Sequence, residues 1–148
     1  MSNVSFFVPG IPVPKGSAKA FVNKRTGRAQ VMQDNREKQK PWASAITLSA
    51  MQYGVQGTLA PVKVDLVFAM PRLKSHFGTG KNATSIKPNA PLAHVSKPDL
   101  DKLIRCVLDA LTGVAWHDDS QVFEVRASKF YSSRPGVTVT LEAFQKEE

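Results

Sequence analysis

The sequence predicts a domain that combines α-helices with β-strands, on the evidence of its length, its composition and its hydrophobic periodicity. The chain has 148 residues, of which 42% are hydrophobic and 22% are charged, close to globular averages. A chain of this length buries roughly 68% of its surface on folding, which is enough for a core of its own. Alternating and helically periodic stretches follow one another along it. We therefore expect a single domain over residues 1–148, not a disordered chain, a collagen or a coiled coil.

Several classes of protein are excluded by what the sequence lacks. No run of 18 apolar residues occurs, so a membrane-spanning helix is not expected, and the proline-rich start is not a signal peptide. The single cysteine, Cys106, excludes an internal disulfide and a cysteine-cluster zinc site. Because it flanks an apolar stripe, we expect a core position for it, not a reactive thiol. The sequence predicts a cytoplasmic protein that is not bound to a membrane.

Alternation of apolar and polar residues predicts the strands. The expected ranges are 4–8, 20–22, 29–31, 62–70, 122–131 and 137–144. The second and third should form a hairpin around a basic turn that contains Gly27. The last two should pair as antiparallel neighbours across the turn 132–136.

The first predicted helix has an ambiguous start. Asp34 can cap a helix that runs to about Tyr53, but Pro41 lies too deep for its first turn. Either the helix kinks at Pro41 or its regular part begins near Lys40. From Trp42 onward, small and apolar residues form one face that is expected to pack in the core.

The second predicted helix is the clearest element in the sequence. Asp99 is a suitable N-cap and Gly113 a suitable C-terminal stop. Between them runs an apolar stripe of unbroken helical period, formed by Leu100, Leu103, Ile104, Val107, Leu108 and Leu111.

The charge is unevenly distributed. The net charge is +8, and the first 98 residues carry fourteen bases against three acids, whereas the last 50 carry six bases against nine acids. A strongly basic protein usually binds a polyanion, most often nucleic acid, although a basic surface can also serve solubility alone.

Two basic segments are candidates for contact with a DNA backbone. One is the hairpin turn, with Lys24 and Arg25, which equally resembles a charged solvent loop. The other is the aperiodic stretch 71–98, which contains no acid. We expect this stretch to be a mobile basic arm that orders on nucleic acid; the alternative is a disordered insertion. Its candidate DNA-binding residues are Arg72, Lys74 and Lys97.

Five of the twelve acids fall within 21 residues: Asp99, Asp101, Asp109, Asp118 and Asp119. If Asp99 lies outside the helix in extended geometry, its carboxylate can converge with that of Asp101. Acids in a first turn also favour the helix dipole, which alone would explain this pair. Folding can bring the second pair, at a loop-to-strand junction, back to the helix start. Three or four carboxylate oxygens suit Mg²⁺, so acids within a basic chain predict metal-dependent phosphodiester chemistry.

The segment Lys97-Pro-Asp-Leu-Asp-Lys-Leu-Ile-Arg-Cys-Val-Leu-Asp-Ala-Leu111, followed by Trp116-His-Asp-Asp-Ser-Gln-Val122, resembles the RusA family of Holliday junction resolvases. The opening Phe7-Val-Pro-Gly-Ile-Pro-Val-Pro-Lys15 is also similar to the N-terminal strand and turn of the phage and prophage type. The resemblance is strongest over about 26 residues and extends plausibly over the whole chain. It implies that Asp99, Asp101 and Asp119 are the catalytic metal-binding acids, with Asp118 as an accompanying metal-site acid.

Two positions depart from the family pattern. The resemblance implies an Asn directly after the second Asp and a catalytic Lys four residues after it, where this chain has Lys102 and Arg105. We expect Arg105 to act in the site by stabilising phosphate charge, although a guanidinium cannot donate a proton at ordinary pH. Lys102 can supply an amine from a neighbouring position and contact the DNA.

The resemblance also implies an α+β domain with a mixed sheet packed against two main helices, and a homodimer whose two-fold symmetry matches that of a four-way junction. The sequence is thus interpreted as a Mg²⁺-dependent endonuclease, with Mn²⁺ as a possible substitute, that resolves Holliday junctions in DNA recombination and repair. The alternatives are a non-catalytic protein that binds branched DNA on the same scaffold, and a broader flap or fork nuclease.

Overall fold

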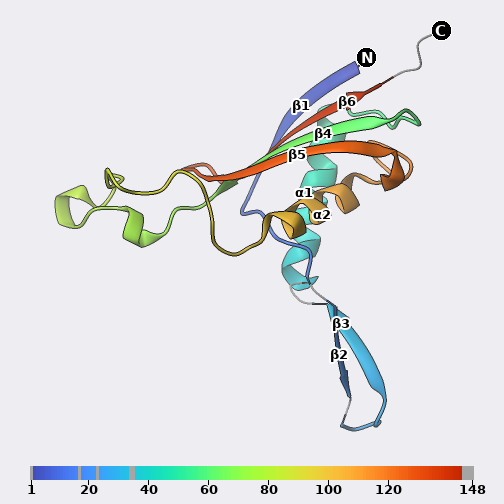
Figure 1. Cartoon of the computed structure of the whole chain (residues 1–148), viewed down its shortest axis with the longest axis horizontal. Helices are drawn as coiled ribbons and strands as arrows, with labels where there is room; N and C mark the ends of the chain where they lie inside the picture. Colours follow the sequence, from blue (N-terminus) through green and yellow to red (C-terminus); the bar gives the residue numbers. More distant parts are fainter. Residues whose placement is uncertain (1, 17, 23, 34–35, 145–148) are drawn as a thin grey trace.

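The computed structural model describes residues 2–16, 18–22, 24–33 and 36–144, and it has an α+β fold (Figure 1). Short 3-10 helices lie in the described loops. In chain order the elements are β1 (Ser2–Pro9), β2 (Ala18–Val22), β3 (Ala29–Gln33), α1 (Arg36–Gln52), β4 (Val62–Met70), η1 (Lys74–His76), η2 (Gly80–Asn82), α2 (Leu100–Leu111), η3 (Asp119–Gln121), β5 (Val122–Tyr131) and β6 (Gly136–Ala143).

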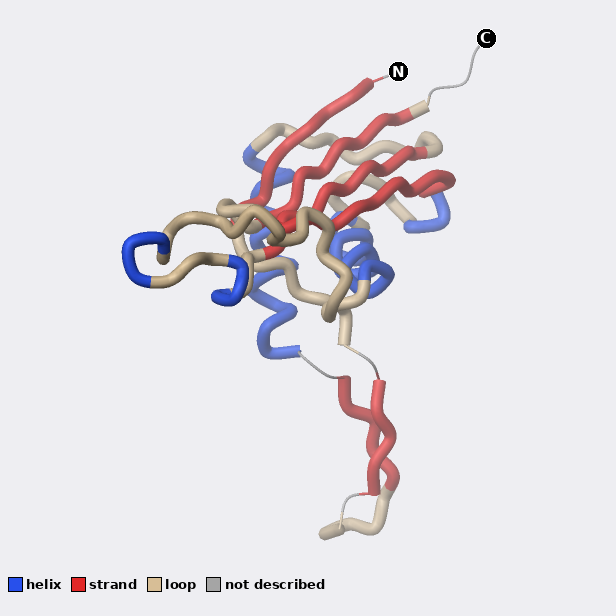
Figure 2. Tube along the Cα trace, turned by 60° about the vertical axis from the view of Figure 1, so that its left-hand side comes forward, coloured by secondary structure: helices blue, strands red, loops and turns tan. Residues whose placement is uncertain are grey.

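The main sheet is mixed and has the strand order β1-β6-β4-β5. The pair β4–β5 is parallel, whereas β6 is antiparallel to both β1 and β4. Burial alternates along β4, so that one face of the sheet forms the core, and α1 and α2 cover this face (Figure 2). The predicted mixed sheet with two main helices is therefore confirmed.

The predicted pairing of the last two strands is wrong. β6 lies between β1 and β4, and β5 pairs with β4 at the edge of the sheet. The cause is burial: Val137, Val139 and Leu141 of β6 are buried and need a central position, whereas β5 has one buried residue, Tyr131. The short link 132–135 passes the end of β4, where Ser132 N–H donates to the Met70 carbonyl at 2.9 Å. It has to span about 10 Å, twice the spacing between strands.

Both helices pack by the faces that the periodicity predicts. In α1, Trp42, Ile46 and Ala50 are buried. The helix begins at Arg36 and includes Pro41, so a regular start near Lys40 is wrong; the predicted cap, Asp34, lies outside the described residues. In α2, the buried side chains are Leu103, Cys106, Val107 and Leu111, and the helix ends before Gly113, whose φ of +91° suits glycine.

The basic stretch 71–98 has more local structure than its lack of periodicity predicts. It contains η1 and η2, a bridge between Phe77 and Ile86, and a second bridge that pairs Ala93 with Phe130 of β5. The 3-10 turns are too short for an apolar period to show in the sequence, and the bridge to Phe130 depends on a distant strand. The end of the stretch therefore joins the edge of the main sheet just before α2 begins.

The predicted hairpin is present as β2 and β3, which pair antiparallel and extend away from the sheet and helices (Figure 1). Its described turn residues, 24–28, are all exposed. Within the described ranges, no helix has the length and apolarity needed to cross a lipid bilayer.

Candidate active site

The start of α2 presents two carboxylates in different backbone settings. Asp99 precedes the helix in extended geometry, with φ −70° and ψ 143°, and Asp101 is exposed in the first turn. Asp99 holds the predicted N-cap position, yet its carboxylate makes no capping hydrogen bond. It accepts one from Lys97 Nζ at 3.1 Å instead, which lowers the pKa of Asp99. The Asp99 carboxylate is therefore charged, and its side chain is 46% exposed at the N-terminal end of α2.

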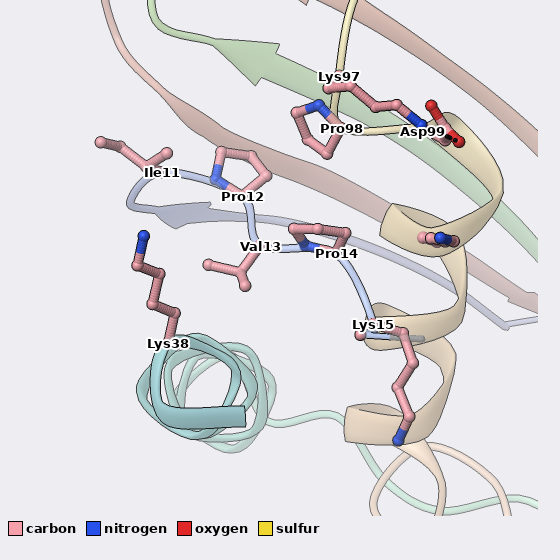
Figure 3. A pocket seen from close by; sticks show the side chains of 11 residues that line it. Ile11, Pro12, Val13, Pro14, Lys15, Lys38, Lys97, Pro98 and Asp99 are labelled. Atoms are coloured by element: carbon pink, nitrogen blue, oxygen red, sulfur yellow. Dashed lines mark hydrogen bonds and ion pairs between the residues drawn. The ribbon is translucent and has the colours of Figure 1, made fainter. Parts of the chain in front are cut away.

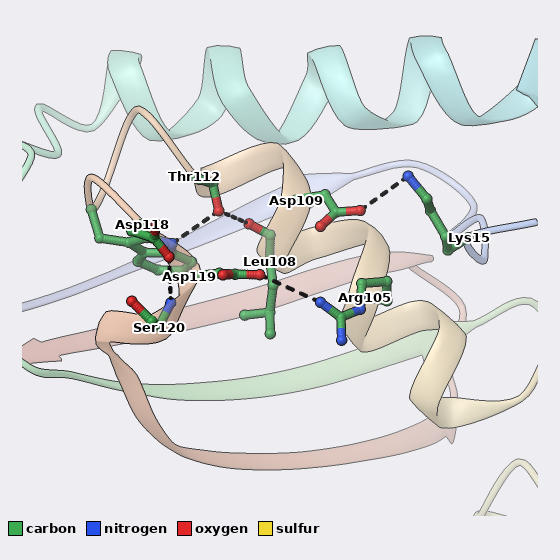
Figure 4. A network of polar contacts seen from close by, with 9 residues as sticks. Lys15, Arg105, Leu108, Asp109, Thr112, Asp118, Asp119 and Ser120 are labelled. Atoms are coloured by element: carbon green, nitrogen blue, oxygen red, sulfur yellow. Dashed lines mark hydrogen bonds and ion pairs between the residues drawn. The ribbon is translucent and has the colours of Figure 1, made fainter.

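The second acidic pair lies at the start of η3, directly before β5: Asp118 is its N-cap and Asp119 its first residue. Asp118 caps this turn, because its carboxylate accepts a hydrogen bond from the Ser120 N–H at 2.9 Å, and this bond lowers the pKa of Asp118. Asp119 points toward α2, where its carboxylate lies 3.5 Å from the guanidinium of Arg105 (Figure 4). The ion pair between Asp119 and Arg105 thus connects this loop with α2. Asp118, in contrast, stabilises the loop itself by capping η3.

Gln121 fixes the loop that carries Asp118 and Asp119. Its side-chain oxygen accepts from the N–H groups of His117 and Asp118 at 2.8 and 2.9 Å. Its side-chain nitrogen donates to the carbonyls of Thr58 and Ala60 at 2.8 and 3.0 Å. Sequence reasoning missed this residue, although a lone amide between the acidic pair and a strand is a signal for such a role.

Lys129 of β5 fixes the turn that leads into α2. Its ammonium group donates to the carbonyls of Ser96 and Pro98 at 2.7 and 2.6 Å. Sequence reasoning also missed this residue. The available signal was its position in the alternating pattern, because Lys129 lies on the same face of the strand as Ala127 and the buried Tyr131. A charged residue on that side needs polar partners, and the turn before Asp99 provides them.

Three of the five clustered acids form ion pairs with bases. Asp99 pairs with Lys97, Asp119 with Arg105 and Asp109 with Lys15. Within the described residues, no group of three His, Cys, Asp or Glu side chains is placed to hold a metal ion. Carboxylates repel one another unless a cation lies between them, and here the cations are lysine and arginine side chains.

The predicted DNA-binding residues are spread over three segments. Lys97 and Lys102 lie at the start of α2, and Lys24 and Arg25 lie in the exposed turn of the hairpin. In the stretch 71–98, Lys74 is exposed in η1. Arg72 is held more firmly, because its guanidinium donates to the Pro91 carbonyl at 2.9 Å and lies 5.5 Å from the centre of the Tyr131 ring.

Comparison with known proteins identifies the family. A sequence profile described as endodeoxyribonuclease RusA matches residues 9–142. The chain belongs to the RusA endodeoxyribonuclease family. RusA proteins are nucleases that act on DNA, and the resolution of Holliday junctions is the activity of the family. The chain is also 32% identical over 142 residues to "Uncharacterized protein YqaN" of Bacillus subtilis (strain 168). The aligned region covers 95% of this chain and 96% of that protein.

The carboxylates of this RusA-family chain suit Mg²⁺ by their chemistry, because Mg²⁺ prefers carboxylate oxygens with water and phosphate. The Asp99 carboxylate makes no capping bond to α2, Asp101 is exposed in the first turn, and Asp119 is 48% exposed beside the same helix. Asp118 fits less well, since its carboxylate already caps η3. Their chemistry makes Asp99, Asp101 and Asp119 the candidate ligands, but within the described residues the three carboxylates do not come together as a formed metal site.

Proposed function

We propose that this chain is a Mg²⁺-dependent endonuclease that resolves four-way DNA junctions. The observation that carries the proposal is the unused cap at the start of α2, where Asp99 keeps a charged carboxylate beside Asp101. An acid that only stabilised the helix would bond to the N–H groups of the first turn. Here the carboxylate faces a lysine in a strongly basic chain of a DNA nuclease family.

The reaction is phosphodiester hydrolysis: water attacks phosphorus, one P–O bond breaks, and the leaving deoxyribose oxygen takes up a proton. Mg²⁺, when bound, supplies Lewis-acid charge for this step. We assign to Arg105 the stabilisation of the extra negative charge at the phosphate, because its guanidinium lies 3.5 Å from the Asp119 carboxylate and a guanidinium can offer two parallel donors to a phosphate. Lys102, one residue after Asp101, is the side chain that can give a proton to the leaving oxygen.

The basic residues outside α2 hold the DNA in this proposal. Lys97 lies beside Asp99, and Arg72 and Lys74 lie in the stretch whose end is joined to β5. Lys24 and Arg25 extend on the hairpin, away from the main sheet (Figure 1). Contacts at such separated points suit a branched substrate better than a short linear duplex, and phosphate contacts position the DNA without reading its sequence.

We further propose that the active form is a homodimer. A four-way junction is cut on two opposed strands, and a two-fold symmetric pair of sites matches this geometry. An exposed apolar surface suitable for a second copy lies on β5, where Phe123 is 56% exposed at the edge of the sheet. Light scattering should give twice the chain mass of 16.2 kDa; a single chain mass at working concentrations would contradict the dimer.

A panel of synthetic DNA substrates tests the function. The protein is incubated with a four-way junction, a three-way fork and a linear duplex, each in Mg²⁺ and in EDTA. We expect paired nicks in the four-way junction when Mg²⁺ is present and no nicks in EDTA. Equal cutting of fork and junction would favour a broader branch nuclease. Tight, salt-sensitive binding of the junction without cleavage in Mg²⁺ or Mn²⁺ would overturn the proposed nuclease activity and would indicate a non-catalytic DNA-binding protein.

A further inference from the structure

A pocket of about 440 Å³ opens beside Asp99, between the start of α2 and the first turns of α1 (Figure 3). Residues 11–16 form one wall, which is apolar from Ile11 to Pro14. The opposite side is formed by Lys97, Pro98 and Asp99, with Lys102 of α2. Its volume lies within the range of small-molecule sites.

The wall formed by residues 11–16 is held in place by its backbone. The Lys15 N–H donates to the Lys102 carbonyl at 3.0 Å, and the Gly16 N–H donates to the side-chain oxygen of Gln39 at 3.1 Å. These bonds fasten the wall to α2 and to α1. The pocket is therefore formed before any ligand arrives, which removes the cost of ordering this segment on binding.

The lining combines strong positive charge with flat apolar surface. The lining contains four lysines, Lys15, Lys38, Lys97 and Lys102, and a single carboxylate, Asp99; the ammonium group of Lys15 pairs with Asp109 outside the pocket. The side chain of Lys38 extends from α1 toward Ile11 and Pro12 (Figure 3). A phosphate alone would need the lysines but not the apolar wall, whereas a nucleotide uses both, since bases bind apolar and aromatic surfaces and phosphates bind ammonium groups.

We propose that this pocket binds one nucleotide of the DNA strand that is cut, beside the scissile phosphate. Its phosphate would contact Lys38 and Lys102, and its sugar and base would lie against Pro12, Val13 and Pro14. A branch point supplies such a nucleotide, because stacking is interrupted there. The inference rests on the proposed function, since it takes Asp99 as the border between the pocket and the reacting phosphate.

The phosphate contact is tested by Lys38→Gln against a matched control, Lys40→Gln. Both lysines are exposed on α1, but Lys40 does not line the pocket. The Kd for a four-way junction is measured in EDTA at several salt concentrations, with cleavage in Mg²⁺ measured in parallel. We expect Lys38→Gln to weaken binding about fivefold and to lower the salt dependence by roughly one phosphate contact. Equal Kd values for the two variants would overturn the proposal that the pocket binds a nucleotide through Lys38.

The base contact is tested on the DNA. Single abasic residues, which keep the phosphate, are placed one at a time along the cleaved strand. We expect one position next to the cut to weaken binding about fivefold or more. Uniform affinity at all positions would overturn a nucleotide site. These results can fail while wild-type protein still cuts junctions, whereas a wild-type protein that neither binds nor cuts branched DNA overturns the proposed function as well.

Discussion

Asp99 and Asp118 occupy equivalent positions, each at the N-cap of a helical turn, and their carboxylates do different things. Asp118 accepts the Ser120 N–H, as a capping residue should. Asp99 leaves the first turn of α2 without a side-chain cap and bonds to Lys97. Asp118 therefore has a structural role, whereas the Asp99 carboxylate is available for catalysis. The sequence alone does not distinguish them, because both belong to pairs of acids.

Arg105 tests the chemistry at the residue scale. We expect Arg105→Ala to lower kcat for junction cleavage by about 10²-fold, because the phosphate loses a charged donor in the transition state. Arg105→Lys should keep cleavage closer to wild type, since an amine retains the charge. Stability should change little, because the ion pair with Asp119 is exposed. Unchanged kcat in Arg105→Ala, with the surface variant Arg126→Ala as control, would remove Arg105 from the mechanism.

At the scale of elements, two side chains hold the loops that carry the acids. Gln121 bonds with both ends of its amide and ties the η3 loop to the segment before β4. Lys129 ties the turn before α2 to β5. The η3 loop is thus held by the segment before β4, and the turn before α2 is held by β5.

Removal of Gln121 should therefore affect both stability and activity. Gln121→Leu leaves four backbone groups without their partner, and we expect the free energy of unfolding to fall by about 2–3 kcal/mol. The cleavage rate of the folded variant should also fall, because Asp119 loses its fixed position. Denaturant unfolding and single-turnover cleavage measure the two effects. A stable variant with wild-type cleavage would show that the loop is held in another way.

Lys129→Met should act on the other loop. The variant keeps most of the apolar stem but loses two charged hydrogen bonds, so we expect a loss of about 1.5–3 kcal/mol in unfolding free energy. Amide hydrogen exchange at Ser96, Lys97 and Asp99 should become faster, whereas exchange in β1 should not change. Equal protection at these three residues in both proteins would contradict the anchoring role of Lys129.

At the scale of the whole molecule, a single core joins the sheet to both helices. It includes Leu66 and Phe68 of β4, Ile46 of α1 and Cys106 of α2. Burial in this core raises the pKa of the Cys106 thiol to about 11. The thiol of the unfolded chain titrates near pH 8.5. The folded protein thus binds this proton more tightly, and the stability it gains is present below about pH 8.5 and is lost as the pH rises toward 11.

The expected result is a decrease in the free energy of unfolding between pH 8.5 and 11 that is about 1–2 kcal/mol larger in wild type than in Cys106→Ala. Urea unfolding at several pH values measures it. Comparing the slopes removes the effect of lysine titration and of the cavity that the substitution leaves. Identical pH dependence in the two proteins would contradict burial of the thiol.

The sequence predicts most elements because periodicity is a local property. The strand over 62–70 and the helix before Gly113 follow directly from spacing. The position of β6 does not, since it depends on which strand needs two neighbours, and the short link 132–135 is by its length also compatible with a hairpin. In the site, the acids are visible as a cluster, but their pairing with Lys97 and Arg105 depends on the tertiary placement of η3.

Junction nicking by Asp101→Asn decides whether the acids at the start of α2 bind a catalytic metal, with Asp109→Asn as the matched control on the same helix. Asp101 has its place at the start of α2, whereas Asp109 pairs with Lys15. We expect Asp101→Asn to lose cleavage in Mg²⁺ while it binds the junction as tightly as wild type or more tightly, because repulsion of the phosphate is relieved. Asp109→Asn should cut normally. Wild-type cleavage by Asp101→Asn, or a collapse of its circular-dichroism melt, would contradict a metal-binding acid and indicate a helix-stabilising one.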